Sequence, residues 1–211
     1  MKISVIVPVY NSGQYLERVL QALNDQDYPS DQYELIFVDN GSTDDSMAIL
    51  EQQTNILLLS ESERGSYAAR NAGITRARGE ILAFTDSDCF PEPDWLSVID
   101  RTFETESMQL ILGRRIPTGD GRWIKMAAEY ENLKTEQICR SDDPSVYFGY
   151  TNNMAVRRQV MDELGPFITR PRGADTMFVI HVARNLSCSA IGFCRDMVIR
   201  HAELTSVRAY F

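Results

Sequence analysis

Two kinds of hydrophobic spacing alternate along the first half of the chain. Short, nearly continuous apolar runs predict buried strands covered on both faces, and apolar residues three or four positions apart between them predict amphipathic helices. Such an alternation with short connections is typical of a parallel, doubly wound α/β sheet. The predicted strands are residues 2–9, 34–38, 55–60, 80–84 and 109–116, and the predicted helices lie over 15–23, 44–52, 66–78 and 94–103.

The second half of the chain has a less regular pattern. It predicts helices over residues 123–138, 158–164 and 175–185, a strand over 147–156, and two strands within 189–199. No internal repeat, low-complexity tract or linker separates the halves, so residues 1–211 are expected to form a single domain.

Composition and charge narrow the possible partners. With 44% hydrophobic and 24% charged residues, the chain has enough apolar side chains for a packed core. Its formal net charge of −9 excludes nucleic acid as an expected partner, because an acidic surface repels a phosphate backbone. A nucleotide would need a local site, with a cation to offset its charge.

The cysteines and the apolar runs bear on the compartment. The four cysteines have no C-x-x-C spacing, which favours free thiols in a reducing compartment over a zinc site. No apolar run approaches the ~20 residues of a membrane span. We therefore expect a cytoplasmic protein, with attachment to the inner face of a membrane left open and the oligomeric state unknown.

Polar clusters follow three of the predicted strands, at residues 8–12, 39–42 and 85–88. Parallel α/β sheets bind ligands beyond the carboxyl ends of their strands, so these clusters are expected to line one crevice. Asp86 and Asp88 would repel each other there, and a divalent cation would remove that cost while leaving positions for phosphate oxygens. Asp39 has two interpretations that its spacing leaves open, a turn or helix-capping residue and a carboxylate that binds a nucleotide base.

Several other nucleotide and metal motifs are absent from the sequence. It contains no G-x-x-x-x-G-K-[ST], no G-x-G-x-x-G after the first strand and no H-E-x-x-H. The glycine-rich basic loop of a sugar nucleotidyltransferase is also missing, because residues 10–15 hold one glycine and no lysine or arginine. Phosphate binding through a metal ion remains the favoured interpretation.

Five segments in this order resemble family 2 of the glycosyltransferases, which has the GT-A fold. The likeness runs from about Lys2 to His201, and Asn40 stands where the family usually has a second aspartate. It implies a nucleotide-sugar-binding half over 1–105, an acceptor-side half over 106–211, and a Rossmann-like, mostly parallel sheet. The segments are 5–11, 37–44, 69–73, 84–88, which contains the D-x-D motif, and 151–158.

The resemblance also implies a role for individual residues and a set of ligands. The donor would be a nucleoside-diphosphate sugar, with a UDP-sugar foremost, and the acceptor a carbohydrate or lipid-linked saccharide in polysaccharide biosynthesis. His201 has the alternative of an ordinary histidine at a strand end. By the resemblance, Pro8, Tyr10, Asp39, Arg70 and Asp86 would bind the nucleotide, Asp86, Asp88 and His201 would hold Mg²⁺ or Mn²⁺, and Asn153 and Gly173 would line the acceptor and sugar pocket.

The expected catalytic base is Asp175, in a segment that departs from the family pattern. Ala174 replaces the usual glutamate, and Met177 stands where another acid is frequent. Asp175 would accept the proton of the acceptor hydroxyl in a single inverting displacement, although an aspartate here is also a good helix N-cap. The two lost acids imply an altered acceptor or sugar pocket or reduced activity, so a non-catalytic nucleotide-sugar-binding protein is the alternative.

Overall fold

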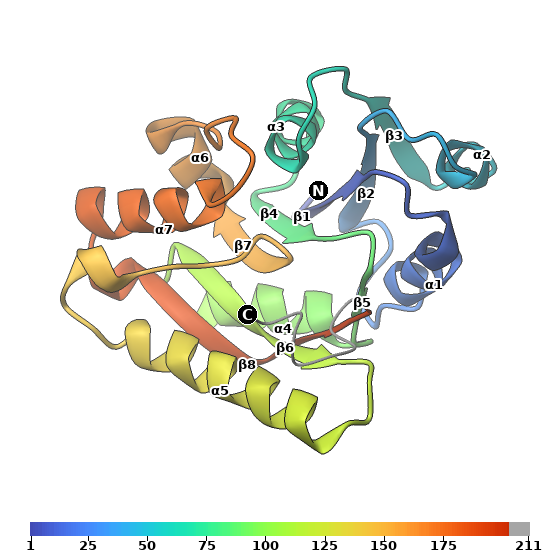
Figure 1. Cartoon of the computed structure of the whole chain (residues 1–211). Helices are drawn as coiled ribbons and strands as arrows, with labels where there is room; N and C mark the ends of the chain where they lie inside the picture. Colours follow the sequence, from blue (N-terminus) through green and yellow to red (C-terminus); the bar gives the residue numbers. More distant parts are fainter. Residues whose placement is uncertain (203–211) are drawn as a thin grey trace.

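The first half of the chain folds as its hydrophobic pattern predicts. The computed structural model describes residues 1–202. Strands β1, β2, β3 and β4 alternate with helices in the predicted order and pair in parallel (Figure 1). The elements are β1 (Ile3–Val9), α1 (Gly13–Asn24), β2 (Tyr33–Asp39), α2 (Ser46–Glu51), β3 (Ile56–Ser60), α3 (Ser66–Arg76), β4 (Ile81–Thr85), β5 (Cys89–Pro91) and α4 (Trp95–Thr105).

The second half adds three strands, β6, β7 and β8, to the same sheet, and β5 joins the sheet by pairing with β8. The strand order is β3-β2-β1-β4-β7-β6-β8-β5, with β4–β7, β6–β7 and β5–β8 antiparallel and β6–β8 parallel. The α/β class and the mostly parallel sheet are therefore confirmed. The elements are β6 (Leu110–Pro117), α5 (Arg122–Ile138), η1 (Pro144–Val146), β7 (Asn153–Arg157), α6 (Arg158–Leu164), α7 (Ala174–Asn185), η2 (Cys188–Ala190) and β8 (Ile191–His201).

Two strand predictions in the second half were wrong. The strand expected over 147–156 is shorter, because residues 147–152 do not pair with a neighbouring strand. Tyr147 is buried there instead, and its hydroxyl donates to Ser141 O at 2.9 Å. The two strands expected within 189–199 are one strand, β8. Its exposed residues Arg195 and Asp196 interrupt the apolar pattern, and they lie where the register against β6 shifts, between Gly113 and Arg114.

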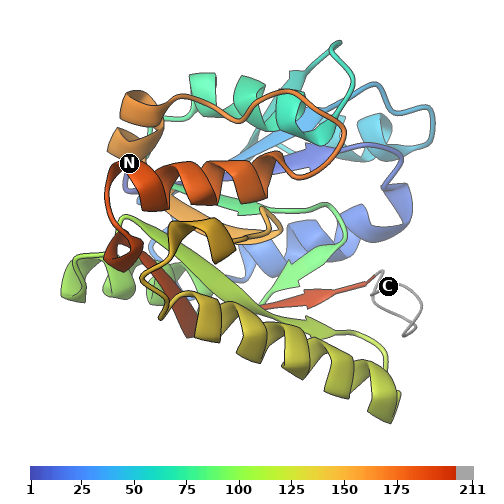
Figure 2. The same cartoon turned by 60° about the vertical axis from the view of Figure 1, so that its left-hand side comes forward.

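Helices cover both faces of the sheet, as the continuous burial of β1 requires. Its residues alternate between two apolar clusters, so that Val5 packs with residues of α1 and α4 while Ile6 packs with residues of α3 and α7. Figure 1 shows α3, α6 and α7 together on one side, and Figure 2 shows α5 running along the β6 and β8 end of the molecule. Gly73 lets α3 approach β1, because a Cβ there would lie 2.6 Å from Ile6 Cγ2.

The short strand β5 positions a residue from the far end of the chain. It pairs antiparallel with β8, which places Cys89 opposite His201. Three residues are too few for a periodic signal, so the sequence pattern did not predict this strand. Its consequence is that the turn after β4 lies beside the last residues of β8. Within residues 1–202, every helix is too short or too polar to cross a membrane.

Candidate functional site

The three polar clusters meet at one edge of the sheet, as predicted. Strand β1 lies between β2 and β4, and all three run parallel, so their carboxyl ends are neighbours. A cavity of about 650 Å³ opens there, with walls from the ends of β1 and β4, from Asn40 and from the start of α3. Ser12 Oγ and Ser87 Oγ lie 2.6 Å apart, a hydrogen bond that joins the turn after β1 to the turn after β4. A cavity of this size is typical of a small-molecule site.

Asp86 lines this cavity and contacts a buried arginine. The guanidinium of Arg70 is 3% exposed, and its Nη2 donates to Asp86 Oδ1. Burial raises the pKa of Asp86, and the neighbouring Asp88 raises it further, against the opposing charges of Arg70 and His201. A dication at this turn would relieve the repulsion between the two carboxylates.

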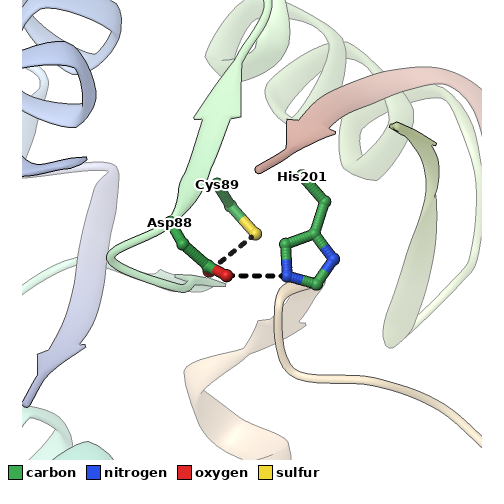
Figure 3. Close-up of side chains that lie close together, drawn as sticks. All are labelled: Asp88, Cys89 and His201. Atoms are coloured by element: carbon green, nitrogen blue, oxygen red, sulfur yellow. Dashed lines mark hydrogen bonds and ion pairs between the residues drawn. The ribbon is translucent and has the colours of Figure 1, made fainter. Parts of the chain in front are cut away.

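Asp88 has two neighbours that approach its carboxylate from different strands (Figure 3). His201 Nε2 lies 2.9 Å from Asp88 Oδ2, and Cys89 Sγ donates to Asp88 Oδ1 at 3.5 Å. One ligand atom from each of these three residues falls within 4.8 Å of the others. The strand pairing of β5 with β8 therefore brings the histidine predicted from sequence to the D-x-D turn.

The chemistry of these donors fits a hard divalent cation. Carboxylate oxygens suit Mg²⁺ or Mn²⁺, and the imidazole is a borderline donor that favours Mn²⁺ over Mg²⁺, whereas a softer metal would draw on the thiolate. Burial and the charges of Asp86 and Asp88 raise the pKa of Cys89 well above its usual range, so its thiol stays protonated and donates a hydrogen bond. Asp88 and His201 are then the residues of this cluster suited to hold the ion, whereas Asp86 lies outside the cluster and pairs with Arg70.

Asp39 is engaged in its own turn. Its carboxylate accepts hydrogen bonds from Gly41 N at 3.0 Å and from Ser42 N at 3.2 Å, and the residue is 6% exposed. These hydrogen bonds correspond to the first of the two interpretations of Asp39 from the sequence, a turn residue. Pro8 and Tyr10 line the cavity. Asp39 does not line it, but Asn40, the residue after it, does.

Arg64 is a cavity residue that sequence reasoning missed. Its Nη1 donates to Asn40 O at 3.1 Å, and its guanidinium carbon lies 5.1 Å from the ring centroid of Tyr10. Gly65 follows with a φ of 125°, which brings the chain into the start of α3. Nothing in the spacing marks Arg64, because the contact depends on how the loop after β3 folds across the end of β2.

Asp175 lies in the first turn of α7, where it is 8% exposed. Its Oδ2 accepts a hydrogen bond from Thr151 N at 3.4 Å, and its Oδ1 accepts one from Thr176 N at 2.9 Å. Burial and the Asp175 carboxylate raise the pKa of Tyr67 to about 12, and the Tyr67 ring lies 5.5 Å from the guanidinium carbon of Arg70. A chain of contacts therefore connects Asp175 to the Arg70–Asp86 pair.

The two residues expected to line the acceptor pocket lie elsewhere in the fold than the cavity. Asn153 is 1% exposed, and its amide is fully used: Nδ2 donates to Arg114 O and Met197 O at 2.9 Å, and Oδ1 accepts from Trp95 Nε1 at 2.9 Å. Gly173 precedes α7 with a φ of 78°, a left-handed conformation that favours glycine. Neither residue lines the cavity at the strand ends.

Comparisons with known proteins identify a sequence family and a relative. The sequence model of the family described as Glycosyl transferase family 2 matches residues 4–165. The chain is similar to glycosyltransferase AglE of Haloferax volcanii, with 35% identity over 173 residues that make up 78% of this chain. It spans 55% of the length of AglE, about half of that relative.

Solved structures share the fold over almost the whole chain. The crystal structure of S. aureus TarS 1–349 in complex with UDP-GlcNAc matches with a TM-score of 0.75 and 22% identity, covering 96% of this chain and 58% of that one. The mannosyltransferase PcManGT of Pyrobaculum calidifontis, in complex with GDP-Man and Mn²⁺, matches with a TM-score of 0.76 and 24% identity, covering 99% and 58%.

Proposed function

The chain belongs to glycosyl transferase family 2, and from this premise we propose that it transfers a sugar from a nucleoside-diphosphate sugar to a hydroxyl acceptor with the help of Mg²⁺ or Mn²⁺. The observation that carries the proposal is the Asp86–Asp88 turn at the end of β4. It opens into the cavity at the strand ends and has Arg70 on one side and His201 on the other.

The donor would occupy this cavity. Pro8 and Tyr10 would contact the base, Asp39 would support that side of the cavity by holding the turn that follows it, and Arg70 would lie near the ribose. Asp86, Asp88 and His201 would hold the metal. A bound dication would offset the negative charge that grows on the departing diphosphate. The co-crystallised UDP-GlcNAc of TarS and the GDP-Man and Mn²⁺ of PcManGT support such a donor and such an ion, with a UDP-sugar as the first candidate.

The acceptor would bind on the side of Asp175. Asp175 would take the proton of the acceptor hydroxyl as that oxygen forms its bond to the anomeric carbon and the bond to the diphosphate breaks, with inversion. General-base catalysis of this kind contributes about 10²–10⁴-fold to a rate. The acceptor would be a glycan or a lipid-linked saccharide, and Asn153 and Gly173 would shape its pocket indirectly, by holding the strands and the start of α7 in place.

A cytoplasmic location at the inner face of a membrane belongs to the same proposal, since lipid-linked saccharides are presented there. Cosedimentation of the protein with lipid vesicles tests this part. A protein that stays in the supernatant with every vesicle composition would remove it without affecting the proposed transfer.

The experiment for the main proposal measures nucleoside diphosphate released from UDP-GlcNAc, UDP-glucose and GDP-mannose, with Mn²⁺ or with a chelator. We expect nucleoside diphosphate to be released with Mn²⁺ and not with the chelator. In Asp88→Asn the rate of release should fall at least about 100-fold, because a neutral amide holds a dication poorly. Asp196→Asn is the matched control, since Asp196 is exposed on β8. Full activity of Asp88→Asn in the presence of the chelator would contradict the proposal.

The loss of two acids at Ala174 and Met177 motivates the alternative of a nucleotide-sugar-binding protein without transferase activity. The same experiment separates the two when donor binding is measured by calorimetry. Donor that binds in the presence of Mn²⁺ but is neither hydrolysed nor transferred would favour the alternative.

A further inference from the structure

The segment between α6 and α7, residues 165–173, is anchored at one buried residue. Phe167 belongs to no helix or strand, yet it is only 2% exposed. Figures 1 and 2 both show this segment passing between α3 and α7. The residues that follow, 168–172, are all exposed. Phe167 is therefore the point at which the segment before Asp175 is attached to the rest of the fold.

Asn71 of α3 holds the backbone of Phe167 through both its N–H and its carbonyl group. Asn71 Nδ2 donates to Phe167 O at 2.7 Å, and Asn71 Oδ1 accepts from Phe167 N at 3.1 Å. An amide side chain offers a donor and an acceptor together, so it can pair with one backbone residue in this way, whereas a carboxylate or an apolar side chain cannot. These two bonds tie the segment to the helix that carries Arg70.

The ring of Phe167 contacts aromatic side chains from three different elements. Its centroid lies 5.8 Å from that of Tyr67 in α3, 5.4 Å from that of Phe84 in β4 and 5.1 Å from that of Phe178 in α7. These separations are typical of favourable aromatic pairs. Phe167 therefore packs α3, β4 and α7 against one another.

Each of these elements also leads to a residue of the proposed site, two or three positions from its aromatic side chain. These residues are Arg70 in α3, Asp86 after β4 and Asp175 in α7. Arg70 and Asp86 contact each other directly, whereas within residues 1–202 no hydrogen bond joins Asp175 to either of them. Tyr67, which connects Asp175 to Arg70, is one of the rings that Phe167 contacts. The place of the proposed base relative to the donor side thus depends on packing around Phe167.

We propose that Asn71 and Phe167 are positioning residues, which hold the Asp175 carboxylate where it can take the proton of the acceptor hydroxyl. The proposal rests on the proposed function, because it needs Asp175 as the base. Neither Asn71 nor Phe167 lines the cavity at the strand ends, so a change at either leaves the residues around the donor in place. A displacement of a catalytic group by about 1 Å can cost about 10²-fold in rate.

The test compares turnover with donor affinity on the full chain in the presence of Mn²⁺. Turnover is the kcat for release of nucleoside diphosphate from UDP-GlcNAc, UDP-glucose and GDP-mannose, with water as the acceptor. Donor affinity is that for UDP, measured by calorimetry. We expect Asn71→Ala and Phe167→Leu each to lower kcat by about 10–100-fold while the affinity for UDP stays within about twofold of the wild type.

A double variant separates positioning from a general loss of structure. If Asn71 acts through Asp175, its replacement has little left to disturb once the carboxylate is gone. We therefore expect Asp175→Asn and the double variant Asn71→Ala/Asp175→Asn to differ in kcat by less than about threefold. A residue that only supports the fold would lower kcat by the same factor in both backgrounds.

Ser4→Ala is the matched control for lost hydrogen bonds. Ser4 is buried in the first half of β1, at the opposite end of the sheet from the cavity. Its Oγ donates to Glu34 Oε1 at 2.7 Å and accepts from Gly79 N at 2.8 Å. Ser4→Ala should lower the free energy of unfolding in urea, as Asn71→Ala does, and should keep the wild-type kcat.

Three results would overturn the proposal. The first is an unchanged kcat in both Asn71→Ala and Phe167→Leu, and the second is an equal loss from Asn71→Ala with and without the Asp175 carboxylate. The third is a fall in the affinity for UDP that matches the fall in kcat, or an equal fall in kcat in Ser4→Ala, since either would reflect a general loss of structure. Failure of the proposed function gives a different result, namely no turnover of any donor by the wild-type protein, and the positioning role would fail with it.

Discussion

Asn40 stands where the family usually has an aspartate, and the structure gives a physical reason for the amide. Its Nδ2 donates to Glu61 O at 2.9 Å and to Glu63 O at 2.7 Å, and its Oδ1 accepts from Gly65 N at 2.7 Å. The residue is 5% exposed, so water cannot replace these partners. Asn40→Asp would place a carboxylate oxygen against two carbonyl oxygens.

The magnitude follows from the two donated bonds. Each lost hydrogen bond that leaves a buried partner unsatisfied costs about 1–3 kcal/mol, so we expect the loss of two bonds in Asn40→Asp to lower the free energy of unfolding by about 2–6 kcal/mol at pH 7. That is a large share of the stability of a domain this size, which is about 5–15 kcal/mol. Arg64 and Gly65 line the cavity, and Asn40 holds the loop that carries them. Donor affinity should therefore fall when Asn40→Asp loosens this loop.

The carboxyl group introduced at position 40 would also make stability depend on pH. Facing carbonyl oxygens, it would have a pKa in the folded protein above the value of about 3.9 in the unfolded chain. The unfolded state then releases its proton first, so the stability of the variant falls as pH rises above about 4 and recovers on acidification. A protonated carboxyl can donate one hydrogen bond to a carbonyl, which restores part of the loss.

Urea unfolding of the wild type and of Asn40→Asp at pH 7 and pH 5 measures both effects. Asn40→Ala removes the same bonds without a charge and should show the loss without the pH dependence. Asn55→Asp is the matched control, because Asn55 donates its amide to Asn24 Oδ1 at the surface. An Asn40→Asp variant as stable as the wild type at pH 7 would refute the reasoning from these contacts.

Three further predictions concern the base, the packing of α3 and a buried carboxylate. Asp175→Asn should lower the transfer rate by about 10²–10⁴-fold in steady-state kinetics while donor affinity by calorimetry is kept. Gly73→Ala should lower the free energy of unfolding by about 1–3 kcal/mol in urea, since its Cβ would lie 2.6 Å from Ile6 Cγ2 and push α3 away from β1. Although burial opposes it, hydrogen bonds from Ser4 and Arg78 hold the pKa of Glu34 below its usual range. The ionised Glu34 carboxylate therefore stabilises the fold fully above its unfolded pKa of about 4.3, and this stabilisation is lost as pH falls through its lowered pKa in the folded protein. The stability difference between wild type and Glu34→Gln should thus shrink on acidification below about pH 4.

Each of these predictions has a control or a contradicting result. Transfer by Asp175→Asn at the wild-type rate would assign the proton to another group. Gly121→Ala should leave stability unchanged, because a Cβ there meets only Ile124 Cγ2, at 3.5 Å; an equal loss in both glycine variants would contradict the close approach of α3. A Glu34→Gln difference that stays constant or grows on acidification would show that the contacts of Glu34 do not depend on its charge.

Local patterns in the sequence determine most of the first half of this protein. The apolar runs of β1 and β4 and the helical spacing of α1 and α4 are set by residues near each other along the chain, and burial on both faces follows from their continuity. The position of the polar clusters at strand ends follows as well, because parallel strands bring their carboxyl ends together. The D-x-D turn could therefore be named as a candidate from the pattern, whereas Tyr10 and Arg70 were assigned their roles by the family resemblance.

Long-range packing decided what the local patterns could not. The pairing of Asp88 with His201 joins residues 113 positions apart through the three-residue strand β5, which is too short to leave a periodic signal. Asn153 shows the same limit: the family resemblance implied a pocket residue, but in the fold β6, β8 and Trp95 of α4 converge on its amide. The sequence alone determines the chemistry of each side chain, whereas its neighbours, and with them its charge balance and burial, are decided by contacts between residues distant in the chain.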